Sequence, residues 1–140
     1  MSLTAQVLRV HQAIYRLTDG RLGHGMIGVP TLLLRTRGRR SGVTRTNALV
    51  YARDGDDYLL VASNGGADRD PGWLHNIRAD ANVEIQVGRR RQPGVASVIY
   101  RSEPGFERLW KIVNQNNHDR YNAYQRQTTR PIPVVVVRVS

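Results

Sequence analysis

Three segments of the chain place apolar residues at the helical spacing of three and four positions. The first covers residues 4–17, where arginine and glutamine flank an apolar stripe, so we expect an amphipathic N-terminal helix. The second begins at Asp70-Pro71, because Asp caps helical amides and Pro suits the first helical position. The third begins after a cap at Ser102 and is interrupted at residues 114–117.

Between these helices, alternating or continuous apolar runs predict short strands that come in adjacent pairs. We expect residues 43–52 to pair with residues 58–62 across a turn of aspartates and glycine. Further strands are expected over residues 31–35, 83–87, 95–100 and 134–137. Adjacent antiparallel pairs argue against a doubly wound parallel sheet and favour a mainly β, α+β fold built on one small antiparallel barrel.

The length of 140 residues fits a single domain over residues 1–140, and a hydrophobic content of 40% suffices for a packed core. The chain contains no cysteine, which excludes disulfides, thiolate metal sites and a cysteine nucleophile. Its four histidines lack the spacing of a helical zinc site, so we expect no metal centre. Neither a secretion signal nor an apolar run of ~20 residues is visible, so we expect a cytoplasmic protein.

Positive charge is the strongest feature of the composition. The chain has 21 Lys+Arg against 11 Asp+Glu, which gives a formal net charge of +10. Lys111 is the only lysine, so the other cations are arginines, whose planar donor fork grips phosphate and carboxylate. Nucleic acid, an anionic membrane surface and an anionic small molecule are the partners that such charge suits. The few aromatic residues lie on predicted apolar faces, so we expect no specific nucleic-acid binding.

Residues 36–42 form the clearest candidate site. Glycines there let backbone amides approach an anion, while Arg39, Arg40 and Ser41 offer charge and a hydroxyl to a phosphate. The segment is not a P-loop, because the G-x-x-x-x-G-K-[ST] pattern is absent. A solvated hairpin turn is the competing interpretation of this segment, and composition alone favours it; it is also the favoured interpretation for Arg89-Arg90-Arg91.

Residues 36–42, followed by residues 45–49, resemble the T-x-G-R-K-[ST]-G-x-x-R-x-x-P-L signature of the deazaflavin-dependent nitroreductases. Further matches to that family follow in order at residues 62–67, 70–76 and 129–134. The resemblance implies a split β-barrel similar to the FMN-binding split barrels, with helices packed around it. It also implies that the coenzyme is F420, a deazaflavin with a polyanionic tail, in preference to FMN.

The same resemblance implies the site residues. Tyr121 and Tyr124 match tyrosines on the substrate side of the family, and Ser63 matches a hydroxyl at the edge of the ring, so these three are the candidate catalytic residues. The implied coenzyme-binding residues are Arg39, Arg40, Ser41, Arg45, Thr46, Asn47, Ala48, Leu49, Val50, Val61, Ala62, Ser63, Asn64, Gly72, Trp73, Leu74, His75, Asn76 and Tyr121.

The implied activity is reduction of a quinone, an enone or a nitroaromatic by hydride transfer from reduced F420. Two other hypotheses stay open: a non-catalytic F420-, heme- or lipid-binding barrel, and a basic module that binds nucleic acid or a membrane surface. The helix at residues 4–17 either caps the barrel, which we favour, or contacts the inner face of the membrane. The partner is a small-molecule hydride acceptor, and both a monomer and a homodimer are compatible with the sequence.

Overall fold

The computed structural model describes residues 29–139. The helix expected at residues 4–17 lies outside the described residues, and so does its contact with a barrel or a membrane. The single domain expected over residues 1–140 stays a prediction for the same reason. None of the helices within residues 29–139 is long and apolar enough to cross a membrane.

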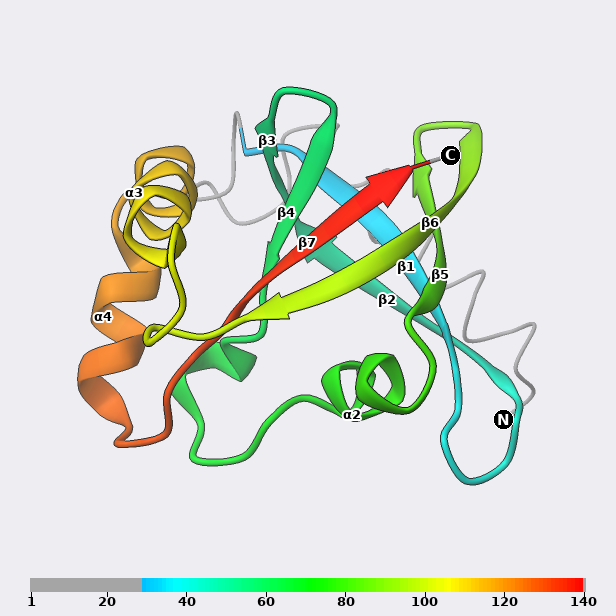
Figure 1. Cartoon of the computed structure of the whole chain (residues 1–140), viewed down its shortest axis with the longest axis horizontal. Helices are drawn as coiled ribbons and strands as arrows, with labels where there is room; N and C mark the ends of the chain where they lie inside the picture. The colour runs from blue at the N-terminus through cyan, green and yellow to red at the C-terminus, as the bar shows by residue number, and fades with distance from the viewer. Residues whose placement is uncertain (1–28, 140) are drawn as a thin grey trace.

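Seven strands form one antiparallel sheet, in the order β2-β1-β5-β6-β7-β4-β3. The strands are β1 (Thr31–Arg37), β2 (Thr44–Val50), β3 (Ala52–Asp54), β4 (Asp57–Val61), β5 (Asn82–Val87), β6 (Arg90–Ile99) and β7 (Val134–Val139). The helical elements are the short 3-10 turn η2 (Asn64–Gly66) and the helices α2 (Gly72–Ala79), α3 (Phe106–Asn116) and α4 (Arg120–Gln127). Figure 1 shows α3 and α4 together beside β3 and β4, with α2 below the sheet.

The two edge strands of the sheet are neighbours in the chain. β2 and β3 lie at opposite ends of the strand order, yet only Tyr51 separates them. One residue spans roughly 3.5 Å, so the sheet must curl until its two edges approach each other. Tyr51 holds this junction through both backbone groups: its N–H donates to Pro30 O at 3.1 Å, and its carbonyl accepts from Asn116 Nδ2 at 2.9 Å. The result is the antiparallel split barrel that the sequence predicts.

Two apolar clusters pack on the two faces of the curled sheet. Along β7, Val135 and Val137 enter the cluster that α2 covers, whereas Val134 and Val136 enter the cluster that α3 and α4 cover. This split follows from the alternation of side chains along a strand. It also explains the uninterrupted apolar run at residues 134–137, which is confirmed as a strand buried on both faces.

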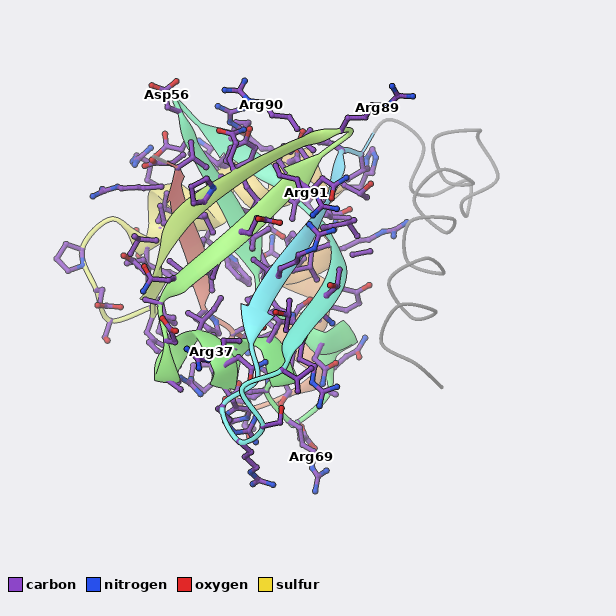
Figure 2. The ribbon with its side chains drawn as sticks, turned by 90° about the vertical axis from the view of Figure 1, so that its right-hand side faces the viewer. Arg37, Asp56, Arg69, Arg89, Arg90 and Arg91 are labelled. Atoms are coloured by element: carbon purple, nitrogen blue, oxygen red, sulfur yellow. The ribbon has the colours of Figure 1, made fainter. Side chains whose placement is uncertain are left out.

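The pairing expected for residues 43–52 is wrong. The structure divides this segment into β2, which pairs with β1, and β3, which pairs with β4. The basic loop is therefore the turn of a β1–β2 hairpin, and the divide falls at Tyr51, where the chain passes between the edges of the sheet. The expected turn at Arg89-Arg90-Arg91 is also shorter, because Arg90 and Arg91 already pair with β5. These arginines are exposed at one end of the molecule, as Figure 2 shows.

The expected helix caps are corrected as well. No side chain caps the N-terminus of α2. The Asp70 carboxylate, which was expected to cap it, forms ion pairs with Arg78 and Arg130 instead. The third helix begins at Phe106 after Gly105, whose φ of 86° favours glycine, and not after Ser102. The interruption falls at residues 117–119 rather than 114–117.

Candidate functional site

Three cavities lie in a row and share walls. The first, of about 440 Å³, lies between the β1–β2 hairpin, β2 and the start of α2. The second, of about 460 Å³, shares Asn47, Gly72 and Trp73 with the first. The third, of about 180 Å³, shares Leu49 and Ser63 with the second. Together they form one groove, which runs from the basic hairpin to α4.

β2 lines this groove along its whole length. Every residue from Arg45 to Val50 lines at least one of the three cavities. Because successive side chains of a strand point to opposite faces, a groove lined by consecutive residues follows the edge of the strand. Five steps of about 3.3 Å make the β2 wall roughly 17 Å long. That length suits an extended ligand rather than a single phosphate group.

The end of the groove at the β1–β2 hairpin is cationic. Arg39, Arg40 and Arg45 line the first cavity, and neither an aspartate nor a glutamate does so. Within residues 29–139, none of these three arginines forms an ion pair of 4.0 Å or less. Their positive charge is therefore not neutralised by the described part of the chain, and it favours an anionic group in this cavity.

The basic hairpin is held in shape by α2. The buried Asn76 accepts a hydrogen bond from the backbone N–H of Arg39 at 3.1 Å and donates one to Thr36 Oγ1 at 3.1 Å. Within the turn, Gly42 N–H donates to Gly38 O at 2.8 Å, and the φ of 72° at Gly42 lies in the left-handed region. The turn backbone is thus fixed, while the arginine side chains on it are exposed.

Two tyrosines stand at the opposite end of the groove. Tyr121 and Tyr124 both line the third cavity, and their rings meet edge to face with centroids 6.3 Å apart. Burial raises the pKa of Tyr121 to about 12, although a hydrogen bond with the Asn117 side chain acts in the opposite direction. A hydrogen bond that lowers a tyrosine pKa is one donated to the phenol oxygen. The O–H of Tyr121 therefore stays protonated at neutral pH and can itself donate.

Asn117 also leaves an unused acceptor at this end. Its Oδ1 is buried and has no hydrogen-bond partner, and the residue lines the third cavity. Arg120 lines the same cavity and acts electrostatically on Tyr121. The tyrosine end thus combines a neutral hydroxyl donor, a cation and an amide within one small, partly apolar cavity.

The groove gathers most of the residues that the sequence predicts as a site. Ala62, Leu74 and His75 are the ones that line none of the three cavities. Ala62 and Leu74 belong to the core beneath the groove, where they support its wall. Trp73 belongs to the same core cluster, and it lines two of the cavities as well.

Several residues of the groove are not predicted as site residues from the sequence. They are Gly65, Arg69, Asp70, Pro71, Asn117 and Arg120. Asn117 could have been found from the run of polar residues that interrupts the third helix, because a buried amide side chain needs a hydrogen-bond partner. Arg120 and Arg69 carry no comparable signal, since the chain has arginines throughout.

Comparison with known proteins identifies the family of this chain. The F420H(2)-dependent quinone reductase family matches residues 7–138. The chain belongs to this family. Its resemblance to deazaflavin-dependent enzymes is thereby confirmed, as is the expectation of an enzyme over a non-catalytic barrel or a basic surface module.

Individual relatives agree with this assignment. A protein named F420H(2)-dependent quinone reductase from Mycobacterium tuberculosis (strain ATCC 25618 / H37Rv) is 53% identical over 133 residues, which are 94% of this chain and 89% of the relative. A solved structure described as an F420-H2 dependent reductase (FDR-A) has a TM-score of 0.69 and 32% identity, over 77% of this chain and 93% of that one. Another, described as a domain-swapped dimer, has a TM-score of 0.69 and 30% identity, over 97% of this chain and 99% of that one.

The residues present fit the coenzyme of an F420H(2)-dependent quinone reductase. Thr46 Oγ1 is buried at the wall of the first cavity without a hydrogen-bond partner, which leaves one polar group for a ligand to satisfy. The unneutralised arginines at the same end suit a polyanionic tail. The edge of β2 then leads from that end, past Trp73 and Ser63, to the tyrosines.

The raised pKa of Tyr121 predicts a pH effect on stability. Above pH 10 the tyrosine of the unfolded chain ionises, whereas the folded protein keeps its proton up to about pH 12. The free energy of unfolding therefore falls between these values, because the folded state binds more protons. We expect Tyr121→Phe to show a smaller fall than the wild type in urea unfolding at about pH 9 and pH 11. An equal fall in both proteins would contradict the burial of this hydroxyl.

Proposed function

We propose that this chain reduces quinones with reduced F420, holding the anionic tail of the coenzyme at the basic hairpin and the acceptor at the tyrosine end of the groove. The observation that carries this proposal is the single groove along β2. It joins a cavity with three unneutralised arginines to one with a protonated tyrosine. Membership of the F420H(2)-dependent quinone reductase family supports the coenzyme and the acceptor class.

The residues of the first two cavities bind and orient the coenzyme. Arg39 and Arg40 neutralise its tail by charge-assisted hydrogen bonds. Asn47 and Trp73, which line both cavities, position the ring. Once bound, the reduced coenzyme supplies a hydride. The protein has no need of a general base at this point, and no aspartate or glutamate lines the first cavity.

The residues of the third cavity stabilise the negative charge that forms on the acceptor. A quinone that takes up a hydride, which carries two electrons, becomes a hydroquinone monoanion, and one proton then completes the hydroquinone. The O–H of Tyr121 donates a hydrogen bond to the developing oxyanion. Arg120 stabilises the same negative charge, and Ser63 and Tyr124 bound the pocket in which the acceptor ring lies. An electrostatic donor in a small, partly apolar cavity acts more strongly than one in water.

A double substitution at the basic hairpin tests the coenzyme site. We expect Arg39→Ala with Arg40→Ala to weaken F420 binding by about 1.5–3 kcal/mol for each lost contact, and to flatten its dependence on salt. Fluorescence titration of the coenzyme measures both effects. The matched control is Arg89→Ala with Arg90→Ala, which removes the same charge from the tip of the β5–β6 hairpin; Figure 2 shows these two arginines at the end opposite Arg37. Equal affinity of the two double variants would exclude the hairpin as the tail site.

Tyr121→Phe tests the acceptor site. We expect turnover to fall by roughly 10–1000-fold, the effect of removing one electrostatic donor, while the affinity for F420 stays close to that of the wild type. The measurement is single-turnover oxidation of bound reduced coenzyme by menadione. Tyr100→Phe is the control, because Tyr100 lines none of the three cavities. A wild-type rate for Tyr121→Phe would show that its hydroxyl does not stabilise the oxyanion and that the tyrosine only shapes the cavity.

A further inference from the structure

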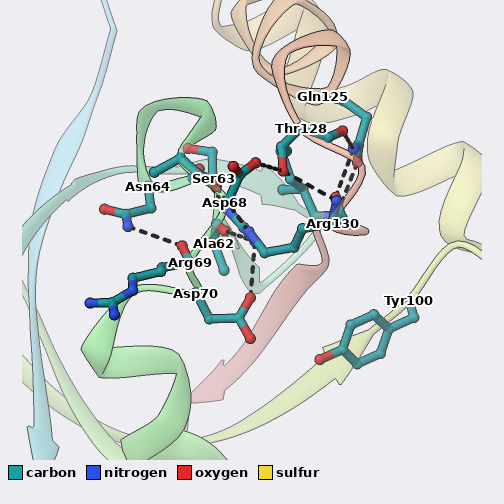
Figure 3. Close-up of polar contacts among 12 residues, drawn as sticks. Ala62, Ser63, Asn64, Asp68, Arg69, Asp70, Tyr100, Gln125, Thr128 and Arg130 are labelled. Carbon is teal, nitrogen blue, oxygen red and sulfur yellow. Dashed lines mark hydrogen bonds and ion pairs between the residues drawn. The ribbon is translucent and has the colours of Figure 1, made fainter.

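Arg130 lies in the segment between α4 and β7, and its guanidinium is buried against the loop of residues 62–70. Its side chain is only 11% exposed. Three backbone carbonyls of the loop accept hydrogen bonds from it: Ala62 at 3.1 Å, Ser63 at 2.9 Å and Ala67 at 3.1 Å. The Asp70 carboxylate accepts another at 3.0 Å, as Figure 3 shows. One side chain thus contacts both ends of the loop.

The loop that Arg130 holds forms much of the groove. Ser63, Gly65 and Asp70 line the second cavity, and the first two also line the third. The turn within this loop has three consecutive residues of positive φ, namely Asn64 at 46°, Gly65 at 65° and Gly66 at 85°. For a non-glycine residue such a conformation costs free energy and persists only where surrounding contacts hold it.

The backbone of the Arg130 segment is tied to α4 in turn. Gln125 of α4 donates to the carbonyls of Thr128 and Arg130 at 3.2 and 2.8 Å, and its Oε1 accepts from Ile132 N–H at 2.9 Å. α4 carries the two tyrosines of the third cavity. A continuous series of hydrogen bonds therefore connects the tyrosine helix, through Gln125 and Arg130, to the loop on the opposite wall.

The loop also packs tightly against α4 at one glycine. A Cβ atom at Gly66 would lie 2.6 Å from Gln127 Oε1 and 3.2 Å from Tyr124 O. The loop thus approaches α4 closely only because this residue has no side chain. Hydrogen bonds from Thr128 to Asp68 and from Arg130 to Ala67 close the same interface.

We propose that Arg130 is a positioning residue of the groove, which sets the distance between the Ser63 wall and the tyrosine helix. It lines none of the three cavities, so in the proposed function it contacts neither coenzyme nor acceptor. Its fork of five donors reaches three carbonyls and a carboxylate at once, which the single ammonium group of a lysine cannot do. The part of this proposal that concerns catalysis rests on the proposed function, and the part that concerns loop geometry does not.

Amide hydrogen exchange of the protein without coenzyme tests the loop geometry. The reporters are the N–H groups of Gly66 and Ala67, which donate to Ser63 and Asn64 within the loop. We expect Arg130→Lys to speed their exchange by at least about tenfold, the factor for one lost charge-assisted hydrogen bond, while amides that pair β4 with β7 keep their protection. Unchanged exchange at Gly66 and Ala67, or an equal rise in the exchange rates of β4 and β7, would overturn the proposal. Either result would show that Arg130 does not hold the loop of residues 62–70 specifically.

Arg108→Lys is the matched control. Arg108 also grips an aspartate with both Nη atoms, at 2.9 and 2.8 Å from Asp54, but it lies on α3 outside the groove. A further variant, Asp70→Asn, removes the ion pairs of Asp70 with Arg130 and Arg78 and leaves the three carbonyl acceptors of Arg130 in place. We expect its effect on Gly66 and Ala67 to be smaller than that of Arg130→Lys. An equal effect would show that the ion pairs of Asp70, rather than the fork, position the loop.

Kinetics then connect this geometry to the reaction. In Arg130→Lys we expect a loss of roughly 10–100-fold in both F420 affinity and single-turnover rate with menadione, because small displacements of a wall misalign both ligands. A loss of thermal stability with unchanged affinity and rate would overturn the positioning role. If the wild type binds no F420, the proposed function fails, and the exchange measurement still decides the role of Arg130.

Discussion

The architecture depends on the single residue between the two edge strands. Because Tyr51 alone joins β2 to β3, the sheet cannot lie flat, and its curl brings the two edges together. The same constraint leaves β2 paired on one side only among the described strands. An edge strand presents unpaired backbone donors and acceptors, and here that edge becomes the wall of a groove. The single-residue connection at Tyr51 therefore accounts both for the closure of the barrel and for the free edge of β2 that lines the groove.

The groove differs in character from end to end. At the hairpin, arginines without acidic neighbours create a site for a polyanion, whereas at α4 a buried hydroxyl and an amide surround a much smaller cavity. In the function proposed above, such an arrangement would use binding energy from the remote tail of the coenzyme to hold its reactive end near the acceptor.

Much of this could be predicted from the sequence because the signals were local. The loop at residues 36–42 combines glycine and arginine, which marks it as an anion-binding candidate beside the interpretation of a solvated turn, and the apolar run at 134–137 predicts a buried strand. The division at Tyr51 could not be predicted, because residues 43–52 form one uninterrupted β-favouring run and tertiary closure decides where it breaks. The roles of Asp70 and Arg130 were hidden for a similar reason. Their contacts join segments about 60 residues apart, and no local pattern marks such a pair.

We propose that F420 extends along β2 from the basic hairpin through the second cavity and leaves the tyrosine end of the groove to the acceptor. The most direct measurement is amide NMR of the protein titrated with F420. We expect shifts at Gly38 to Ser41, along β2, and at Ser63 and Gly72, all within one saturable binding event. Shifts confined to the cavity on the other side of the β1–β2 hairpin, which Arg35, Glu84 and Arg91 line, would contradict it.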